Sequence, residues 1–196
     1  MIMENKTPTA EQDLDAAHAR IAQLTRLLQE AWARIEYLEG FTDTDDRVTF
    51  YERRFYPFSN FSSFQVAWHG RVWPTSEHAY HAQKFIDLAH YEAVRTCSSA
   101  HTAMIYARER KPLWRSDWQG VQRRVMKDIC RAKLRQHEYI QKKLVESGDR
   151  ALVEASPVDS YWGWGPDRNG QNELGKIWME LRDEWRAEHP EQWSAQ

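Results

Sequence analysis

The stretch "WPTSEHAYHAQKF", from Trp73 to Phe85, predicts the start of a helix that carries reactive side chains. Thr75 or Ser76 can cap the helix N-terminus with its hydroxyl group. Glu77 then lies in the first turn, where the helix dipole favours a negative charge. Lys84 follows seven residues later, so on a helix it shares a face with Glu77, about 10 Å further along the axis. That separation suits the two ends of a small ligand.

These side chains also have ordinary interpretations. Glu77 could serve only to balance the helix dipole at the surface, and Lys84 could be a solvated lysine. His78 and His81 form an HxxH pair, which lacks the HExxH spacing of a helical zinc site, so we expect no metal there. The spacing alone therefore indicates a site without naming its chemistry.

Local patterns on either side of this stretch predict the fold class. "VTFYERR" and "FQVAWHGRVWP" alternate as strands do, and His69-Gly70 predicts a hairpin turn between two of them. After Thr75 the chain reads as mostly helical, with breaks at residues 147–149, at Pro157 and at "GPDRNG". We expect helices over residues 76–87, 90–95, 99–109, 116–136, 137–147, 148–154 and 172–188. The fold class is therefore α+β, predominantly helical, with a small antiparallel sheet.

The N-terminal part carries a separate pattern, in which apolar residues recur at alternating steps of three and four. They are Leu14, Ala17, Ile21, Leu24, Leu28, Ala31, Ile35 and Leu38. This spacing is the heptad repeat of a coiled coil, and Gly40 is a typical helix stop. The alternative is an amphipathic helix that lies on its own domain, since Leu27 and Trp32 widen the apolar stripe. We expect self-association, made weak or antiparallel by the alanines in the seam.

Composition limits the class of protein further. The 196 residues carry a net charge of −2 and 41% hydrophobic side chains, which fits one domain with an appendage and no strong attraction to DNA or anionic lipid. The chain has no apolar run of about 18 residues, and its N-terminus lacks the pattern of a signal peptide, so we expect a cytoplasmic protein. Cys97 and Cys130 lack the spacing of a disulfide framework or a zinc site.

Six motifs in the globular part point to a known family. They are "FSNF" (58–61), "HGRVWPTSEHAYHAQKF" (69–85), "RERKPLWRSDWQGVQRRVM" (108–126), "RAKLRQH" (131–137), "LVEASPVDSYWGWG" (152–165) and "GQNELGKIWMELR" (170–182). In this order they make the region from Phe50 to Arg186 resemble the NADAR domain family, also called YbiA-like. We therefore expect a disordered tail over 1–12, a coiled-coil helix over 13–39, a linker over 40–47, a NADAR-like domain over 48–188 and a C-terminal tail over 189–196.

The resemblance implies an N-glycosidase, which hydrolyses the bond between a ribose anomeric carbon and a nitrogen. Two substrate types are associated with the family: ribosylaminopyrimidine phosphates of the riboflavin pathway, and ADP-ribose attached to guanine bases, which we favour. Functional positions of the family match Glu77, Trp118 and Asp159, and Lys84 matches as a further candidate. Trp164 stands where many members have a small or acidic residue. The shape of the pocket wall at this position therefore stays open, and so does the identity of the leaving base.

These residue types suit the reaction, which passes through an oxocarbenium-like state with positive charge on the sugar. The Glu77 carboxylate can stabilise that charge and can orient or deprotonate water, while Asp159 can hold ribose hydroxyls or supply a second carboxyl function. Trp118 offers a flat face for the leaving base. Lys84 permits another route, a Schiff base with ring-opened ribose, which requires a lowered pKa. Both routes stay open, and neither needs a metal or a cofactor.

Substrate binding requires a basic rim, because both substrate types carry phosphate. The two basic clusters are Arg108, Arg110 and Lys111, and Arg131, Lys133 and Arg135; each is also typical of a solvated helix face. We expect substrate contacts from Trp118, Asn60, Phe61, Arg108, Lys111, Lys133, Gly163 and Asn172. The rival hypothesis is a non-catalytic module that binds ADP-ribose or a nucleotide. Such a module would not need Glu77, Asp159 and Lys84 together.

Overall fold

The computed structural model describes residues 10–39, 42–51 and 54–193, and the chain divides into two compact units, Met1–Thr42 and Asp43–Gln196. Among the described residues, no helix is long and apolar enough to cross a membrane.

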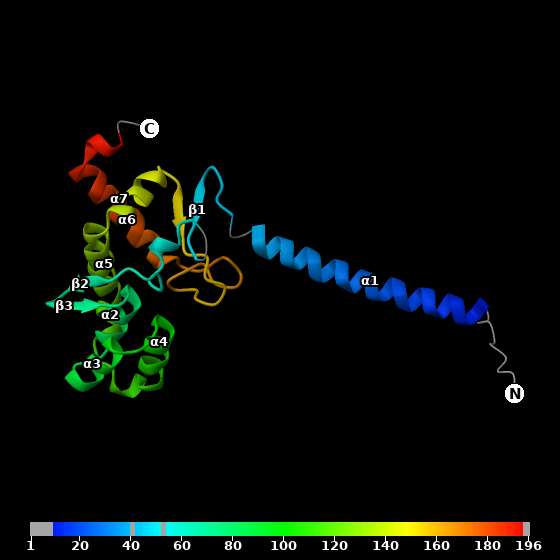
Figure 1. Ribbon diagram of the computed structural model, residues 1–196, viewed down its shortest axis with the longest axis horizontal. Coiled ribbons are helices and arrows are strands. Elements are labelled where there is room, and N and C mark those ends of the chain that lie inside the picture. The colour runs from blue at the N-terminus through cyan, green and yellow to red at the C-terminus, as the bar shows by residue number, and fades with distance from the viewer. Residues whose placement is uncertain (1–9, 40–41, 52–53, 194–196) are drawn as a thin grey trace, which may run out of the picture. The chain divides into compact units, whose positions relative to one another are not determined.

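The described part of the first unit is one helix, α1 (Ala10–Glu39), labelled in Figure 1. It begins inside the segment predicted to be a disordered tail, because no helix breaker separates Ala10 from the heptads; residues 1–9 lie outside the described range. Side chains of the predicted seam are exposed, 60% each for Ile21 and Leu28, and Trp32 beside them is 68% exposed. The helix is confirmed, whereas the coiled coil remains a prediction.

The second unit contains two small sheets. Strands β2 (Val66–Trp68) and β3 (Arg71–Trp73) form the predicted antiparallel hairpin, with Val66 opposite Trp73. His69 and Gly70 turn the chain with φ of 50° and 72°, the left-handed pair that a tight hairpin turn requires.

The other sheet was not predicted. Strands β1 (Arg47–Thr49) and β4 (Ala151–Val153) pair in parallel, and Val48 lies opposite Leu152 with both side chains fully buried. The helix expected over residues 148–154 is therefore wrong. Pairing with a strand far away in the sequence decides the conformation here, and a local pattern does not contain that partner.

The remaining helices follow the predicted order with altered ends. They are α2 (Ser76–Ala82), α3 (Leu88–Arg95), α4 (Ala100–Glu109), α5 (Trp118–Gln136), α6 (Glu138–Glu146) and α7 (Glu173–Glu188). The described residues also form short 3-10 helices, η1 (Tyr56–Phe58), η2 (Lys111–Leu113) and η3 (Pro190–Gln192). The largest change is at α2, which ends five residues before the expected end at residue 87.

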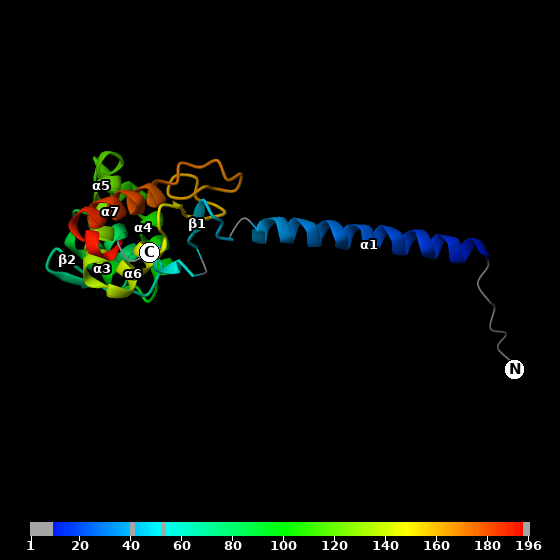
Figure 2. The same cartoon turned by 90° about the horizontal axis from the view of Figure 1, so that it is seen from above.

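Helices α5 and α7 lie side by side at the centre of the second unit (Figures 1 and 2). The predicted stripe of α7 is buried, and its Trp178 donates a hydrogen bond of 2.9 Å to the Phe58 carbonyl. Along the solvent side, Arg123, Lys127 and Arg131 of α5 pair with carboxylates of α7. This packing fixes α5, whose N-terminal Trp118 faces α2.

Candidate active site

The N-terminus of α2 is held in place from two directions. The Thr75 hydroxyl accepts a hydrogen bond from the His78 backbone N–H at 3.3 Å, which confirms the predicted cap. The backbone N–H of Glu77 donates to the Asn60 carbonyl at 3.1 Å, so the "FSNF" loop sets where the helix begins. All seven residues of α2 are buried, which excludes a surface role for Glu77.

Glu77 forms a buried pair with His81, one turn further along α2. The His81 Nε2 lies 2.7 Å from the Glu77 Oε1, and the two side chains are only 6% and 10% exposed. An imidazole N–H directed at one carboxylate oxygen fixes its orientation and leaves the other oxygen for water or substrate. His81 was not predicted as a site residue, although its four-residue spacing from Glu77 was the available signal.

Lys84 reaches the site from the turn that follows α2, rather than from the predicted helix face. The helix ends at Ala82, and the Lys84 backbone N–H donates to the His81 carbonyl at 3.3 Å. Its ammonium lies over three aromatic rings, 4.2 Å from the centroid of Trp114, 5.0 Å from that of Tyr80 and 5.6 Å from that of Trp118.

Burial sets the ionisation of Lys84. The side chain is 6% exposed, and desolvation lowers its pKa to about 8, while Glu77 and Asp159 act in the opposite direction. A substantial fraction of Lys84 is therefore a neutral amine near pH 8, which is the form that can attack an aldehyde.

Aromatic side chains enclose this amine. Tyr80 packs against Trp118 and Trp162, with ring centroids 5.0 and 5.5 Å apart, and burial raises the pKa of its hydroxyl. Trp118 is only 3% exposed, with Tyr80 and Trp114 against it. The stacking of a base on Trp118 stays a prediction.

Asp159 lies in the segment between β4 and α7, drawn in orange in Figure 1. One of its oxygens accepts hydrogen bonds from the backbone N–H groups of Tyr161 and Trp162, both at 2.8 Å. This turn holds the half-buried carboxylate where its charge acts on Lys84. The fold thus brings Glu77, Lys84 and Asp159 together within electrostatic reach.

Glu154 is a fourth ionisable group in this cluster, and the sequence analysis missed it. Burial raises its pKa to about 8, and the negative charges of Asp159 and Glu77 add to the effect. Its backbone N–H donates to the Asn172 side chain at 2.9 Å, and its carbonyl accepts from the Trp164 N–H at 3.0 Å. The signal in the sequence was a glutamate within "LVEAS", among apolar and small residues that predict burial.

Two residues predicted to contact substrate, Gly163 and Asn172, support the Asp159 segment, and their contact with substrate stays a prediction. A Cβ at Gly163 would lie 2.6 Å from the Glu154 carbonyl oxygen, so glycine there makes room for the protein's own backbone. The Asn172 amide bridges Glu154 and Leu152, accepting from the N–H of Glu154 and donating to the carbonyl of Leu152, both at 2.9 Å. Asn172 itself has a φ of 52°.

The "FSNF" positions differ in their surroundings. The side chain of Asn60 is buried against the Met126 sulfur, 3.1 Å from its amide nitrogen, and its carbonyl positions Glu77. Phe61 is 36% exposed, so a contact of Phe61 with substrate remains a prediction.

Lys133, one of the basic residues predicted to contact substrate, binds other parts of the protein. Lys133 is fully buried, and its ammonium donates to the Pro57 and Ser59 carbonyls and to the Ser62 hydroxyl, at 2.6, 2.9 and 2.7 Å. Those bonds use its three donors, so the phosphate role expected for Lys133 is wrong.

Within the same cluster, Arg131 and Arg135 pair with Glu184 and Glu188 of α7. In the other cluster Arg108 and Lys111 are exposed, and they precede Trp114 at the site by only a few residues. A phosphate contact at that rim therefore stays a prediction.

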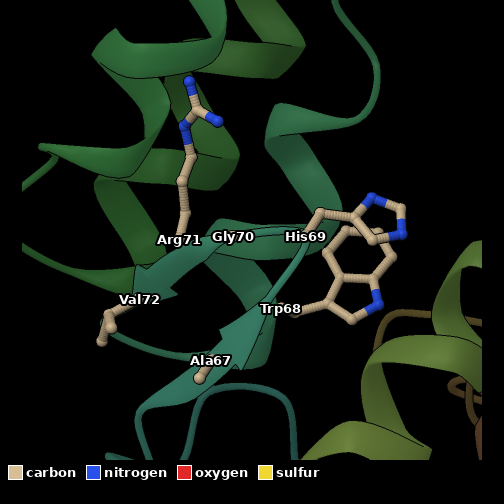
Figure 3. A pocket seen from close by; sticks show the side chains of 6 residues that line it. All are labelled: Ala67, Trp68, His69, Gly70, Arg71 and Val72. Atoms are coloured by element: carbon tan, nitrogen blue, oxygen red, sulfur yellow. The ribbon is translucent and has the colours of Figure 1, made fainter.

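A surface hollow of about 260 Å³ lies elsewhere, on the β2–β3 hairpin (Figure 3). His69 stacks on Trp68 with ring centroids 3.8 Å apart, and Arg71 points away toward Glu92, with which it pairs at 2.7 Å. None of the predicted site residues lines this hollow. Among the described residues, no group of three or more His, Cys, Asp or Glu side chains could hold a metal ion.

Comparison with known proteins identifies the second unit. A family model described as the NADAR domain matches residues 49–186. N-glycosidase YbiA of Escherichia coli K12 is 39% identical over 127 residues, which cover 65% of this chain and 79% of that protein. An N-glycosidase of Nostoc punctiforme is 36% identical over 132 residues, covering 66% of this chain and 85% of its own length.

Two further similarities extend this comparison. A riboflavin biosynthesis protein of Vibrio vulnificus is 38% identical over 132 residues, 67% of this chain and 36% of that protein. The NMR structure of the E. coli protein YbiA matches with a TM-score of 0.70 at 36% identity, covering 78% of this chain and 92% of that one.

Proposed function

The chain belongs to the NADAR domain family, and we propose that it is a hydrolase that cleaves a ribosyl N-glycosidic bond. The observation that carries this proposal is the buried Glu77 carboxylate, fixed by His81 and placed with Asp159 beside the Lys84 amine. Two of the similar proteins bear the name N-glycosidase, which supports the same reaction.

The carboxylates suit direct attack by water. Departure of the base leaves positive charge on the ribose, and Glu77 lies in a water-poor site where its negative charge acts strongly on a nearby cation. Its oxygen can also take a proton from the attacking water. Asp159, held by two backbone N–H groups, remains able to orient ribose hydroxyls.

The lowered pKa of Lys84 supports the second route. A neutral amine can add to C1 of the ring-opened sugar, and the base then leaves C1 with a proton as the lysine Schiff base forms. Water hydrolyses that Schiff base to the free sugar and the lysine amine. Burial also lowers the pKa of Lys133, to about 7, but its three donors bind the 57–62 segment, whereas Lys84 lies within reach of the Glu77 and Asp159 charges. The pair of a buried carboxylate and a partly neutral lysine therefore favours an enzyme over a non-catalytic module that binds ADP-ribose or a nucleotide.

The substrate belongs, in this proposal, to the ribosyl phosphates that carry a planar base on nitrogen. ADP-ribosylated guanine and the ribosylaminopyrimidine phosphates both fit that description, and the name of the Vibrio relative supports the second type. Arg108 and Lys111 are exposed near Trp114, where they could contact phosphate. We place the enzyme in the cytoplasm, with no metal or cofactor in the reaction.

Helix α1 supplies a further part of the proposal, association with a second copy of the chain. Leu14, Leu24 and Ile35 of the predicted seam are 56%, 45% and 44% exposed, and a helix of this kind is more stable when its apolar stripe is buried. The family match begins only at residue 49, so the helix is an addition to the catalytic domain.

The function is tested by measuring release of free base from both substrate types, with Glu77→Gln as the variant. The native protein should release base from at least one substrate, and Glu77→Gln should reduce the rate by about 100-fold or more. Glu109→Gln is the matched control, because its side chain is 64% exposed on α4 and it should retain the native rate. Substrate binding without base release by the native protein would favour the non-catalytic module instead.

A further inference from the structure

One oxygen of the Glu154 carboxyl group lacks the partner that a buried polar atom normally has. The residue is 9% exposed, and its Oε2 is buried without a hydrogen-bond partner among the described residues. Burying an unpaired carboxylate is very costly, whereas a neutral carboxylic acid is tolerated. The side chain is nevertheless directed inward by a backbone that Asn172 and Trp164 hold on both sides.

The charged and titratable groups around Glu154 come from three elements. Glu77 approaches from α2, Asp159 from the segment before α7, and Cys130 from α5, where burial raises the thiol pKa to about 12. Lys133 lies near Cys130, but its three hydrogen bonds are made to the 57–62 segment. Burial and the two negative neighbours favour the protonated acid at Glu154, and the neutral thiol supplies no positive charge to oppose them.

We propose that Glu154 is the proton donor for the leaving nitrogen, a role that rests on the proposed N-glycosidase function. Two carboxyl groups with different protonation states at one site are the arrangement that acid–base catalysis requires. Glu77 would then act as the base, and Glu154 as the acid.

Both carboxyl groups take part in cleavage of the C1′–N bond. The C1′–N bond breaks, its electron pair goes to nitrogen, and nitrogen takes the proton of Glu154. The oxygen of water bonds to C1′, and Glu77 takes the proton that the water loses. A proton returning from Glu77 to Glu154 restores both groups, so the net reaction consumes one water molecule and yields the free base and the sugar phosphate with a hydroxyl on C1′.

The leaving group provides the sharpest test. An amine or guanine nitrogen needs a proton to depart, whereas the pyridinium nitrogen of nicotinamide mononucleotide departs as a neutral base without one. Glu154→Gln should lower kcat/KM by about 100-fold on the substrate that requires protonation and by less than about threefold on the pyridinium substrate. Equal losses on both, or no loss on the first, would overturn the proposal.

A second measurement needs no turnover. Because the pKa of Glu154 is higher in the folded state than in the unfolded one, the folded protein loses stability as pH rises from about 4.5 to 8. Glu154→Gln lacks this titration, so its Tm should rise by about 5 °C or more relative to the native protein between pH 5 and 8.5. Parallel Tm values at all pH values would show that Glu154 holds no proton, and would overturn the donor role.

Glu173→Gln is the control of opposite sign. Arg123 and Lys176 bond to Glu173 and hold its pKa below the usual value, so this variant should be less stable than the native protein at neutral pH. The native protein could release base from none of the substrates and still show the Tm difference from Glu154→Gln. That result would refute the proposed function and the donor role, but not the protonated state of Glu154. If the native protein were active but showed no pH-dependent Tm difference from Glu154→Gln, the donor role alone would be refuted.

Discussion

The pKa of Lys84 can be measured directly. Burial lowers this pKa, and the negative charges of Glu77 and Asp159 raise it. With a pKa of about 8, roughly one tenth of the side chain is free amine at pH 7, about half at pH 8 and about nine tenths at pH 9. An exposed lysine with the ordinary pKa of 10.5 would hold only about 0.03% free amine at pH 7. The aromatic enclosure therefore increases the nucleophilic form roughly 300-fold at that pH.

Replacing Glu77 with glutamine should move the Lys84 pKa further down. The Glu77 charge attracts the ammonium and raises its pKa against the effect of burial, so its removal leaves desolvation less opposed. A decrease of about 1 unit corresponds to a loss of about 1.4 kcal/mol of favourable charge interaction. Glu109→Gln removes an equal charge from an exposed position and should leave the value unchanged.

The assay is an NMR titration of ¹³C-labelled lysine side chains between pH 6 and 10, with the Lys84 signal assigned by its absence in Lys84→Arg. The native midpoint should lie near 8, and that of Glu77→Gln should lie below it. A native midpoint near 10.5 would show that the aromatic side chains do not desolvate Lys84. A higher midpoint in Glu77→Gln than in the native protein would show that the Glu77 charge does not raise the Lys84 pKa.

Other predictions follow from single contacts. Gly163→Ala should lower the free energy of unfolding by about 1–3 kcal/mol in urea, because its Cβ would meet the Glu154 carbonyl. Lys133→Ala should destabilise by about 2–4 kcal/mol through three lost charge-assisted bonds, whereas Arg108→Ala should raise KM with no change in unfolding. Deleting residues 1–40 should give a folded, active monomer by light scattering, while a truncated protein that kept the oligomeric state of the full chain would place the interface elsewhere.

Features governed by local rules could be predicted from the sequence. The Thr75 cap depends on a hydroxyl before a helical run, and the His69-Gly70 turn depends on two residues that accept left-handed backbone. The position of Glu77 in the first turn of α2 follows from the cap. The resemblance to the NADAR family added the reaction, which no spacing in the chain could have indicated.

Features decided by distant contacts could not be predicted in this way. Strand β4 forms because its partner β1 lies elsewhere in the chain, and Lys133 is buried because the 57–62 segment supplies its acceptors. The sequence around β4 has a locally helical pattern, and Lys133 lies in a basic cluster that is typical of a solvated helix face. Glu154 lies within the motif "LVEASPVDSYWGWG", but only the packed structure reveals that one of its carboxyl oxygens is buried without a partner among the described residues.

The central claim is that this site hydrolyses a C–N bond at ribose C1′. Its most direct test is to measure free base and reducing sugar together in a single turnover of a ribosyl-phosphate substrate. The native protein should release the two products in equal amounts, and Glu77→Gln should release neither at an appreciable rate. Base formed without a reducing sugar, or a Glu77→Gln variant that reacts at the native rate, would contradict it.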